Sequence, residues 1–167
     1  MQTTESQPIT GNMLVIDPGG SGKGETGIVY LWLGVDGELP PEVLNSWAVP
    51  NGLEGFREWA MRPMGHFPLN TADFVVCEMF VNRNIPGADL TPVLIEGAVR
   101  YLRPDTVLQP AAGKNTAVPD EVLKRLGLYD IGTGDHHQDR REAARHAVWF
   151  LKKNKHLPTL KKGWPRA

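Results

Sequence analysis

The segment MLVIDPGGSGKGETGIVYLWL, residues 13–33, constrains the fold of this chain most strongly. An apolar run ends at an acid, Asp17, and a glycine-rich stretch follows it. The second apolar run, Gly27–Leu33, is rich in the β-branched and aromatic residues that favour strands. The segment therefore predicts a strand, a glycine-rich turn and a second strand. Because Asp-Pro-Gly also opens turns well, Asp17 is either a turn residue or a functional acid on this evidence.

The glycines do not match a phosphate-binding loop. A P-loop has a glycine six residues before its lysine and a Ser or Thr directly after it. Here those two positions are Asp17 and Gly24, on either side of Lys23. A dinucleotide-binding turn leads directly into a helix, but the residues after Gly27 favour a strand.

Length and composition indicate one globular domain in a reducing compartment. The chain has 167 residues, of which 41% are hydrophobic and 22% are charged. We expect no membrane span and no export signal, because no apolar run is long enough and the first residues lack a basic and then apolar pattern. The single cysteine, Cys77, excludes an internal disulfide and is typical of a cytoplasmic protein.

The charge is unevenly distributed, although the net charge is only −1. Residues 140–167 contain nine Lys and Arg and one acid, Glu142, which gives this part a charge of +8. Residues 1–139 have a charge of −9. This asymmetry indicates a polyanionic partner, with a solvated helix and a disordered basic tail as the alternative.

Apolar patterns predict an α/β fold in the order β-β-β-α-β-α-β-α-α. The predicted strands are Met13–Ile16, Gly27–Leu33, Val43–Val49, Asp73–Val81 and Thr106–Gln109. The predicted helices are Leu53–Met61, Leu90–Leu102, Pro119–Leu126 and Asp139–Lys153. A meander of three strands, followed by strands that alternate with helices, predicts a mixed sheet with helices on both faces. Residues 1–12 are expected to be disordered and residues 154–167 to form a basic tail.

Acids occur at three places beside apolar or small residues. Besides Asp17, Glu78 interrupts the apolar run FVVCEMFV, where an unpaired carboxylate would be costly to bury. Asp139 and Glu142 are three residues apart, so they lie on one face of the last helix. A strand end or an ion pair would also explain Glu78, and the helix N-terminus would also explain Asp139.

Four carboxylates from a first strand, a fourth strand and a late helix suit a two-metal nuclease. Mg²⁺ and Mn²⁺ prefer oxygen ligands. Two such ions roughly 3.5–4 Å apart stabilise the attacking and leaving oxygens of a phosphodiester displacement.

Three segments carry a family resemblance: VIDPG with TG at 15–19 and 26–27, VCEMFV at 76–81, and DRREAARHA at 139–147. In order and spacing they resemble the motifs of RuvC-type Holliday junction resolvases, which belong to the ribonuclease H-like nuclease superfamily. The resemblance implies a five-stranded ribonuclease H-like sheet, with a three-strand meander and two parallel strands, in a nuclease domain at 13–153. It implies an endonuclease that cuts Holliday junctions or other branched DNA with two Mg²⁺ or Mn²⁺ ions per site. The implied catalytic and metal-binding residues are Asp17, Glu78, Asp139 and Glu142.

The resemblance also implies DNA contacts and a homodimer. Lys114 follows the short fifth strand, where such resolvases carry a DNA-contacting lysine. The other candidate DNA contacts are Lys23, Arg140, Arg141, Arg145, Lys152 and Lys155. The helix Leu90–Leu102 is the candidate dimer element, since it offers more apolar surface than one face requires. The size, tryptophan content and basic tail resemble a bacteriophage version, which would act in the host cytoplasm.

The match has two departures, and other functions stay open. The loop between Gly19 and Thr26 is longer than usual, which leaves the role of Lys23 open, and Glu142 stands where Asp is commoner. His136 and His137 precede the last helix, and their role is also open. The alternatives are a terminase or transposase nuclease, an ATPase of the actin or sugar-kinase type, and a non-catalytic DNA-binding protein.

Overall fold

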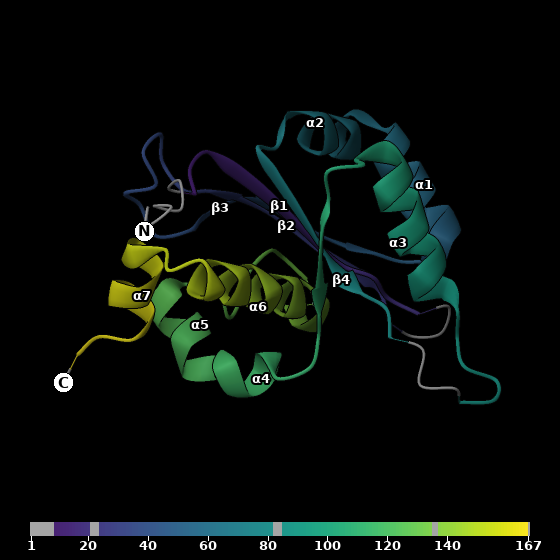
Figure 1. The fold of residues 1–167 in the computed structure, drawn as a ribbon. Helices are drawn as coiled ribbons and strands as arrows, with labels where there is room; N and C mark the ends of the chain where they lie inside the picture. Colours follow the sequence, from purple (N-terminus) through teal and green to yellow (C-terminus); the bar gives the residue numbers. More distant parts are fainter. Residues whose placement is uncertain (1–8, 21–23, 82–84, 135–136, 167) are drawn as a thin grey trace, which may run out of the picture.

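The computed structural model describes residues 9–20, 24–81, 85–134 and 137–166. They form one five-stranded sheet with helices on both of its faces (Figure 1). The strands are β1 (Asn12–Asp17), β2 (Thr26–Trp32), β3 (Glu42–Val49), β4 (Phe74–Met79) and β5 (Val107–Pro110). The helices are α1 (Gly52–Met61), α2 (Pro63–Thr71), α3 (Thr91–Leu102), α4 (Lys114–Ala117), α5 (Asp120–Leu126), α6 (His137–Lys153) and α7 (Leu157–Gly163).

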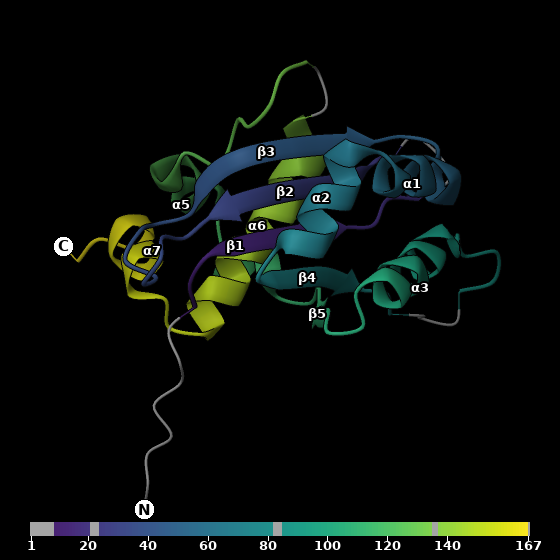
Figure 2. The same ribbon diagram turned by 90° about the horizontal axis from the view of Figure 1, so that it is seen from above.

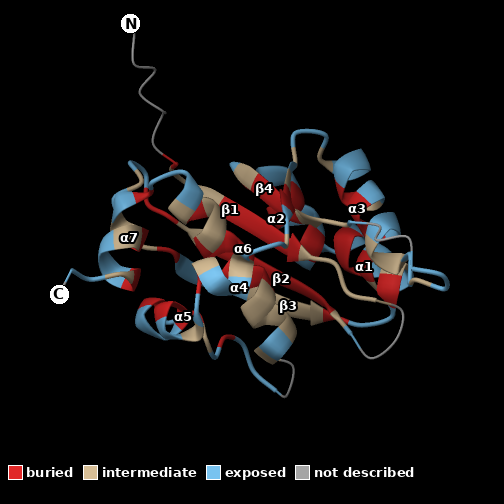
Figure 3. Cartoon of the chain, turned by 60° about the horizontal axis from the view of Figure 1, so that its bottom comes forward, coloured by how far each residue is buried: buried red, intermediate tan, exposed pale blue. Residues whose placement is uncertain are grey.

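The strand order is β3-β2-β1-β4-β5, which confirms the predicted mixed sheet (Figure 2). β1, β2 and β3 form the antiparallel meander, whereas β4 and β5 run parallel to β1. β1 and β2 are buried along almost their whole length, and β3 is the more exposed edge strand (Figure 3). A fully buried central pair explains why these two segments read as nearly continuous apolar runs.

The alternation of side chains along each strand divides the core into two layers. Met13, Val15 and Val29 face a core shared with α5 and α6. Leu14 and Ile16 face the opposite core, which includes residues of α1 and α3. α6 lies very close to the sheet at its start, because a Cβ on Gly27 would fall 1.9 Å from the backbone oxygen of Asp139. Only glycine permits this approach.

The sequence did not predict α2, and β4 is shorter than expected. α2 contains Pro68, which removes a helical hydrogen bond and weakens the pattern. β4 ends at Met79 rather than Val81 because the backbone N–H of Phe80 donates to the Oε2 of Glu96 at 2.9 Å. The strand ladder therefore stops directly after Glu78 and Met79.

The described parts of both chain ends pack on the fold, where residues 1–12 were expected to be disordered and residues 154–167 to form a basic tail. Ile9 is buried in the core, and the N–H of Gly11 donates to the carbonyl of Gly34 at 2.7 Å. The segment predicted as a basic tail contains α7, whose Thr159 is fully buried and whose Gly163 packs against Val122 of α5. No helix among the described residues is both long enough and apolar enough to cross a bilayer.

Candidate active site

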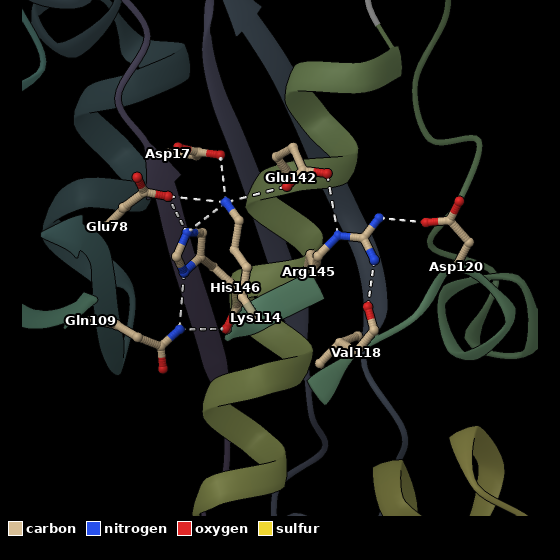
Figure 4. Close-up of polar contacts among 9 residues, drawn as sticks. All are labelled: Asp17, Glu78, Gln109, Lys114, Val118, Asp120, Glu142, Arg145 and His146. Atoms are coloured by element: carbon tan, nitrogen blue, oxygen red, sulfur yellow. Dashed lines mark hydrogen bonds and ion pairs between the residues drawn. The ribbon is translucent and has the colours of Figure 1, made fainter. Parts of the chain in front are cut away.

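Three of the four predicted acids meet around the ammonium of Lys114. Asp17 ends β1, and Glu78 lies near the end of the parallel neighbour β4, so both side chains reach the same edge of the sheet. Glu142 reaches the same place from α6. The Nζ of Lys114, in α4, lies 3.5 Å from Oδ2 of Asp17, 3.0 Å from Oε2 of Glu78 and 3.2 Å from Oε2 of Glu142 (Figure 4).

The environment separates the pKa values of Asp17 and Glu78. Burial, together with the like charges of Glu78 and Glu142, raises the pKa of Asp17 to about 8 against the opposing effect of Lys114. Burial also acts to raise the pKa of Glu78, but the hydrogen bond with His146 and the charge of Lys114 outweigh it and lower this pKa to about 2. Glu78 is therefore the acid that this network holds ionised.

His146 is a member of the cluster that the sequence did not reveal. It is fully buried, and its Nε2 contacts Oε2 of Glu78 and lies 3.0 Å from the Nζ of Lys114. Burial lowers its pKa, which favours the neutral form of the imidazole. One ligand atom from each of Asp17, Glu78 and His146 lies within 4.8 Å of the others, the only such metal-ligand group among the described residues. The spacing of four residues between Glu142 and His146, on one helical face, is the signal that would have indicated it.

Asp139 and His137 lie outside this group of three. Asp139 is in the first turn of α6, where its backbone oxygen packs against Gly27. The Nδ1 of His137 lies 3.1 Å from the backbone oxygen of Ile131. His136 lies outside the described residues. The structure thus brings Asp17, Glu78 and Glu142 to one cation and leaves Asp139 one turn before Glu142.

The donor set fits a divalent metal ion. Carboxylate oxygens are the ligands that Mg²⁺ and Mn²⁺ prefer. An ammonium already lies between three of them, which demonstrates that this position favours positive charge. The attraction of these acids raises the pKa of Lys114 although burial acts to lower it.

The predicted DNA-binding cations differ in how far solvent reaches them. Arg145 is buried at 5% exposure, and its guanidinium bonds to Asp120 at 2.6 Å, to Glu142 at 3.2 Å and to the backbone oxygen of Val118. It is a structural link between α5 and α6 and presents no free cation to DNA, contrary to the expectation from its charge. Lys23 lies outside the described residues.

The remaining predicted cations lie on or after α6. Arg140 donates to the backbone oxygen of Thr133 at 2.9 Å. Arg141 stacks 3.5 Å from the ring centroid of Tyr129 and pairs with an acid at 3.2 Å. Lys152 donates to a backbone oxygen at 2.9 Å, and Lys155 is exposed beyond the end of α6.

Comparison with known proteins gives a likeness in structure alone. No protein-family model matches the chain, and no curated protein matches its sequence. A structure of Thermus thermophilus RuvC aligns with a TM-score of 0.59 and 15% identity, over 85% of this chain and 96% of that chain. A structure of T. thermophilus RuvC in complex with Holliday junction substrate aligns with a TM-score of 0.58 and 14% identity, over 86% of this chain and 96% of that chain. The fold implied by the three motifs is confirmed: the chain has a RuvC-like fold.

Proposed function

We propose that this chain is a metal-dependent endonuclease that cuts Holliday junctions or other branched DNA by two-metal phosphodiester hydrolysis. The observation that carries the proposal is the meeting of Asp17, Glu78 and Glu142 around one cation at the edge of a RuvC-like sheet. A RuvC of this fold has been solved with a Holliday junction. A non-catalytic DNA-binding protein would have no need to bring three carboxylates together where they repel one another.

Asp17, Glu78, Glu142 and Asp139 are the proposed ligands of two Mg²⁺ or Mn²⁺ ions. When bound, such ions activate water and stabilise the charge on the attacking and leaving oxygens. Asp17 and Glu78 present their carboxylates from adjacent strand ends, and Glu142 presents its carboxylate from α6. Lys114, held at 3.0–3.5 Å from these acids, is the cation best placed to contact the phosphate beside the cut.

A side-by-side cleavage assay tests this function. Four-way, three-way, flap and linear duplex DNA are incubated with the protein and Mg²⁺, Mn²⁺ or EDTA, with Asp17→Asn as the inactive control. We expect metal-dependent cuts in four-way junctions, at most weak cleavage of linear duplex, and no cuts with EDTA or with the variant. Equal cleavage of linear duplex would favour a terminase or transposase type of nuclease.

An ATPase of the actin or sugar-kinase type has less support. Such enzymes bind their nucleotide between two lobes, whereas the described residues form one sheet with its covering helices. A nucleotide-binding measurement separates this alternative, because an ATPase would bind ATP–Mg²⁺ without DNA.

A homodimer is the proposed assembly, because paired nicks in two strands require two matched sites. The outer surface of α1 and α3 supports it. Tyr101 is 86% exposed, Met61 79% and Leu94 54%, and an apolar groove runs between the two helices. Leu94→Glu with Tyr101→Glu is expected to give a monomer in sedimentation velocity and unpaired nicks in junctions. A wild-type chain that is monomeric at micromolar concentration, yet makes paired nicks, would contradict the dimer.

The proposed place of action is a reducing cytoplasm, that of the host cell if the protein comes from a bacteriophage. Cys77 is buried in β4, and burial raises the pKa of its thiol well above the ordinary value. A neutral, buried thiol reacts slowly and serves as a small apolar residue.

A further inference from the structure

The buried imidazole of His146 has a partner at each ring nitrogen. Its Nε2 contacts Oε2 of Glu78. Its Nδ1 lies 3.1 Å from the side-chain nitrogen of Gln109, a β5 residue that is 2% exposed. Glu78 and Gln109 are direct neighbours in the pairing of β4 with β5, so both contacts are fixed by the sheet (Figure 4).

The backbone determines which way the Gln109 amide points. Its nitrogen also lies 3.0 Å from the backbone oxygen of His146, and only an N–H can donate to a carbonyl. Turning the amide around would place its oxygen against that carbonyl oxygen. The NH₂ group therefore faces His146, although Oε1 of Gln109 has no hydrogen-bond partner in the described part of the chain.

This orientation fixes the position of the proton on the imidazole. The NH₂ group of Gln109 donates to Nδ1, so Nδ1 carries a lone pair and no hydrogen. An imidazole ring with no hydrogen on Nδ1 carries one on Nε2, and Nε2 donates it to Glu78. An Nε2 that carries a hydrogen can neither accept from Lys114, 3.0 Å away, nor bind a metal ion.

We propose that His146 is a positioning residue, held by Gln109 with its proton on Nε2, which orients the carboxylate of Glu78 and is not itself a metal ligand. This inference rests on the proposed metal-dependent function, because it assigns a role beside a proposed ligand. It resolves the ambiguity of a group in which Asp17, Glu78 and His146 are all close enough to share an ion. A donor that fixes one oxygen of Glu78 leaves the other for an ion, as hydrogen bonds behind metal ligands commonly do.

Nuclear magnetic resonance tests the proton position without any activity measurement. In protein labelled with ¹⁵N at histidine, we expect His146 to show an unprotonated Nδ1 and a protonated Nε2, both before and after Mg²⁺ is added. Pulsed electron paramagnetic resonance of the Mn²⁺-loaded protein should show no directly bound imidazole nitrogen. A proton on Nδ1, or direct coupling of Mn²⁺ to His146, would overturn the proposal.

Mg²⁺ affinity, measured by calorimetry without DNA, tests the positioning role. His146→Leu is expected to weaken Mg²⁺ binding about 10- to 100-fold. His146→Gln should lose only a few-fold, because its amide NH₂ extends about as far as Nε2 and can still donate to Glu78. His156→Leu is the matched control, since it removes a buried imidazole that bonds to Thr159 and leaves the site intact. Equal losses in the Leu and Gln variants of His146 would contradict the role.

Gln109→Met serves if His146→Leu does not fold. It removes the donor to Nδ1, so we expect part of the His146 population to move its proton to Nδ1, with a smaller loss of Mg²⁺ affinity. An unchanged proton position in this variant would contradict the assignment to Gln109. A wild-type protein that binds no Mg²⁺ or Mn²⁺ would refute the proposed function, whereas the proton position on His146 is measured independently of it.

Discussion

The ammonium of Lys114 lies 3.2 Å from Oε2 of Glu142, so α4 supplies a cation to the acid-bearing face of α6. The same ammonium compensates Asp17 and Glu78. We therefore predict that Lys114→Met lowers the free energy of unfolding in EDTA by roughly 1–3 kcal/mol, because three acids lose their shared partner. Urea denaturation measures this, and Lys161→Met, at an exposed site, is the control.

Mg²⁺ should stabilise the Lys114→Met variant more than the wild type. A ligand that binds only the folded state stabilises it in proportion to the logarithm of its concentration over its dissociation constant. Without the ammonium the acids attract a divalent ion more strongly, so the rise in Tm with Mg²⁺ is expected to be larger. Equal rises in Tm would indicate that Lys114 and the ion do not compete for these acids.

Asp17→Asn and Glu78→Gln should both abolish cleavage but change stability in opposite directions. The pKa of Asp17 in the fold, about 8, exceeds its ordinary 3.8, so the fold loses stability relative to the unfolded chain as the pH rises from 3.8 to about 8. The pKa of Glu78, about 2, is below its ordinary 4.5. Its contribution to stability is present above 4.5 and is lost as the pH falls toward 2.

Denaturation in EDTA at pH 9 measures the difference. We expect Asp17→Asn to raise the free energy of unfolding and Glu78→Gln to lower it. DNA binding is the control for both variants, since neither removes a cation. The same direction of change in both would contradict the division of charge between the two acids.

Arg145→Met should destabilise the protein without changing how it binds DNA. The guanidinium is buried and links α6 to Asp120 and to the backbone of Val118. Breaking such a pair costs several kcal/mol when both partners are buried. Because Asp120 is half-exposed, we expect a loss of roughly 2–3 kcal/mol. A reduced salt dependence of DNA binding at unchanged stability would instead make Arg145 a phosphate contact.

Local patterns predicted the sheet and most helices well, because buried strands and amphipathic helices repeat in sequence. They located Asp17 and Glu78 because an acid in an apolar run is costly unless it has a role. Glu142 followed from its helical spacing to Asp139. These predictions used only the pattern of residues within a single strand or helix.

The features that sequence did not predict depend on contacts between distant elements. Lys114 was expected to contact DNA, yet its position among three acids depends on how α4 packs beside β4 and α6. His146 lies on an apolar face of its helix, and its role follows only from its contacts with Glu78 and Gln109, which belong to other elements. In the sequence, the segment that forms α7 resembled a basic tail. Its buried residues are Thr159 and Gly163, so they leave no apolar pattern that would have predicted a packed helix.

The basic residues after α6 are predicted to bind DNA arms away from the cut. Lys153 ends α6 and is roughly 16 Å along the helix axis from Glu142, at about 1.5 Å per residue, so the residues beyond it are not beside the proposed scissile phosphate. Truncation would remove the packing of α7 on α5, so substitution of exposed side chains is the cleaner test. Lys155, Lys161 and Lys162 are exposed and can be replaced by Gln.

The triple variant should weaken binding to junctions and linear duplex alike. Each phosphate contact contributes about −0.9 to the slope of log affinity against log salt, so we expect the slope to flatten by up to about 2.7. Preference for four-way junctions should survive, because we assign it to the dimer surface and to Lys114. Arg57→Gln on α1, across the sheet from α6, is the control and should leave the slope unchanged. If the triple variant lost only its junction preference, the residues after α6 would recognise the branch, and the role given to Lys114 would be wrong.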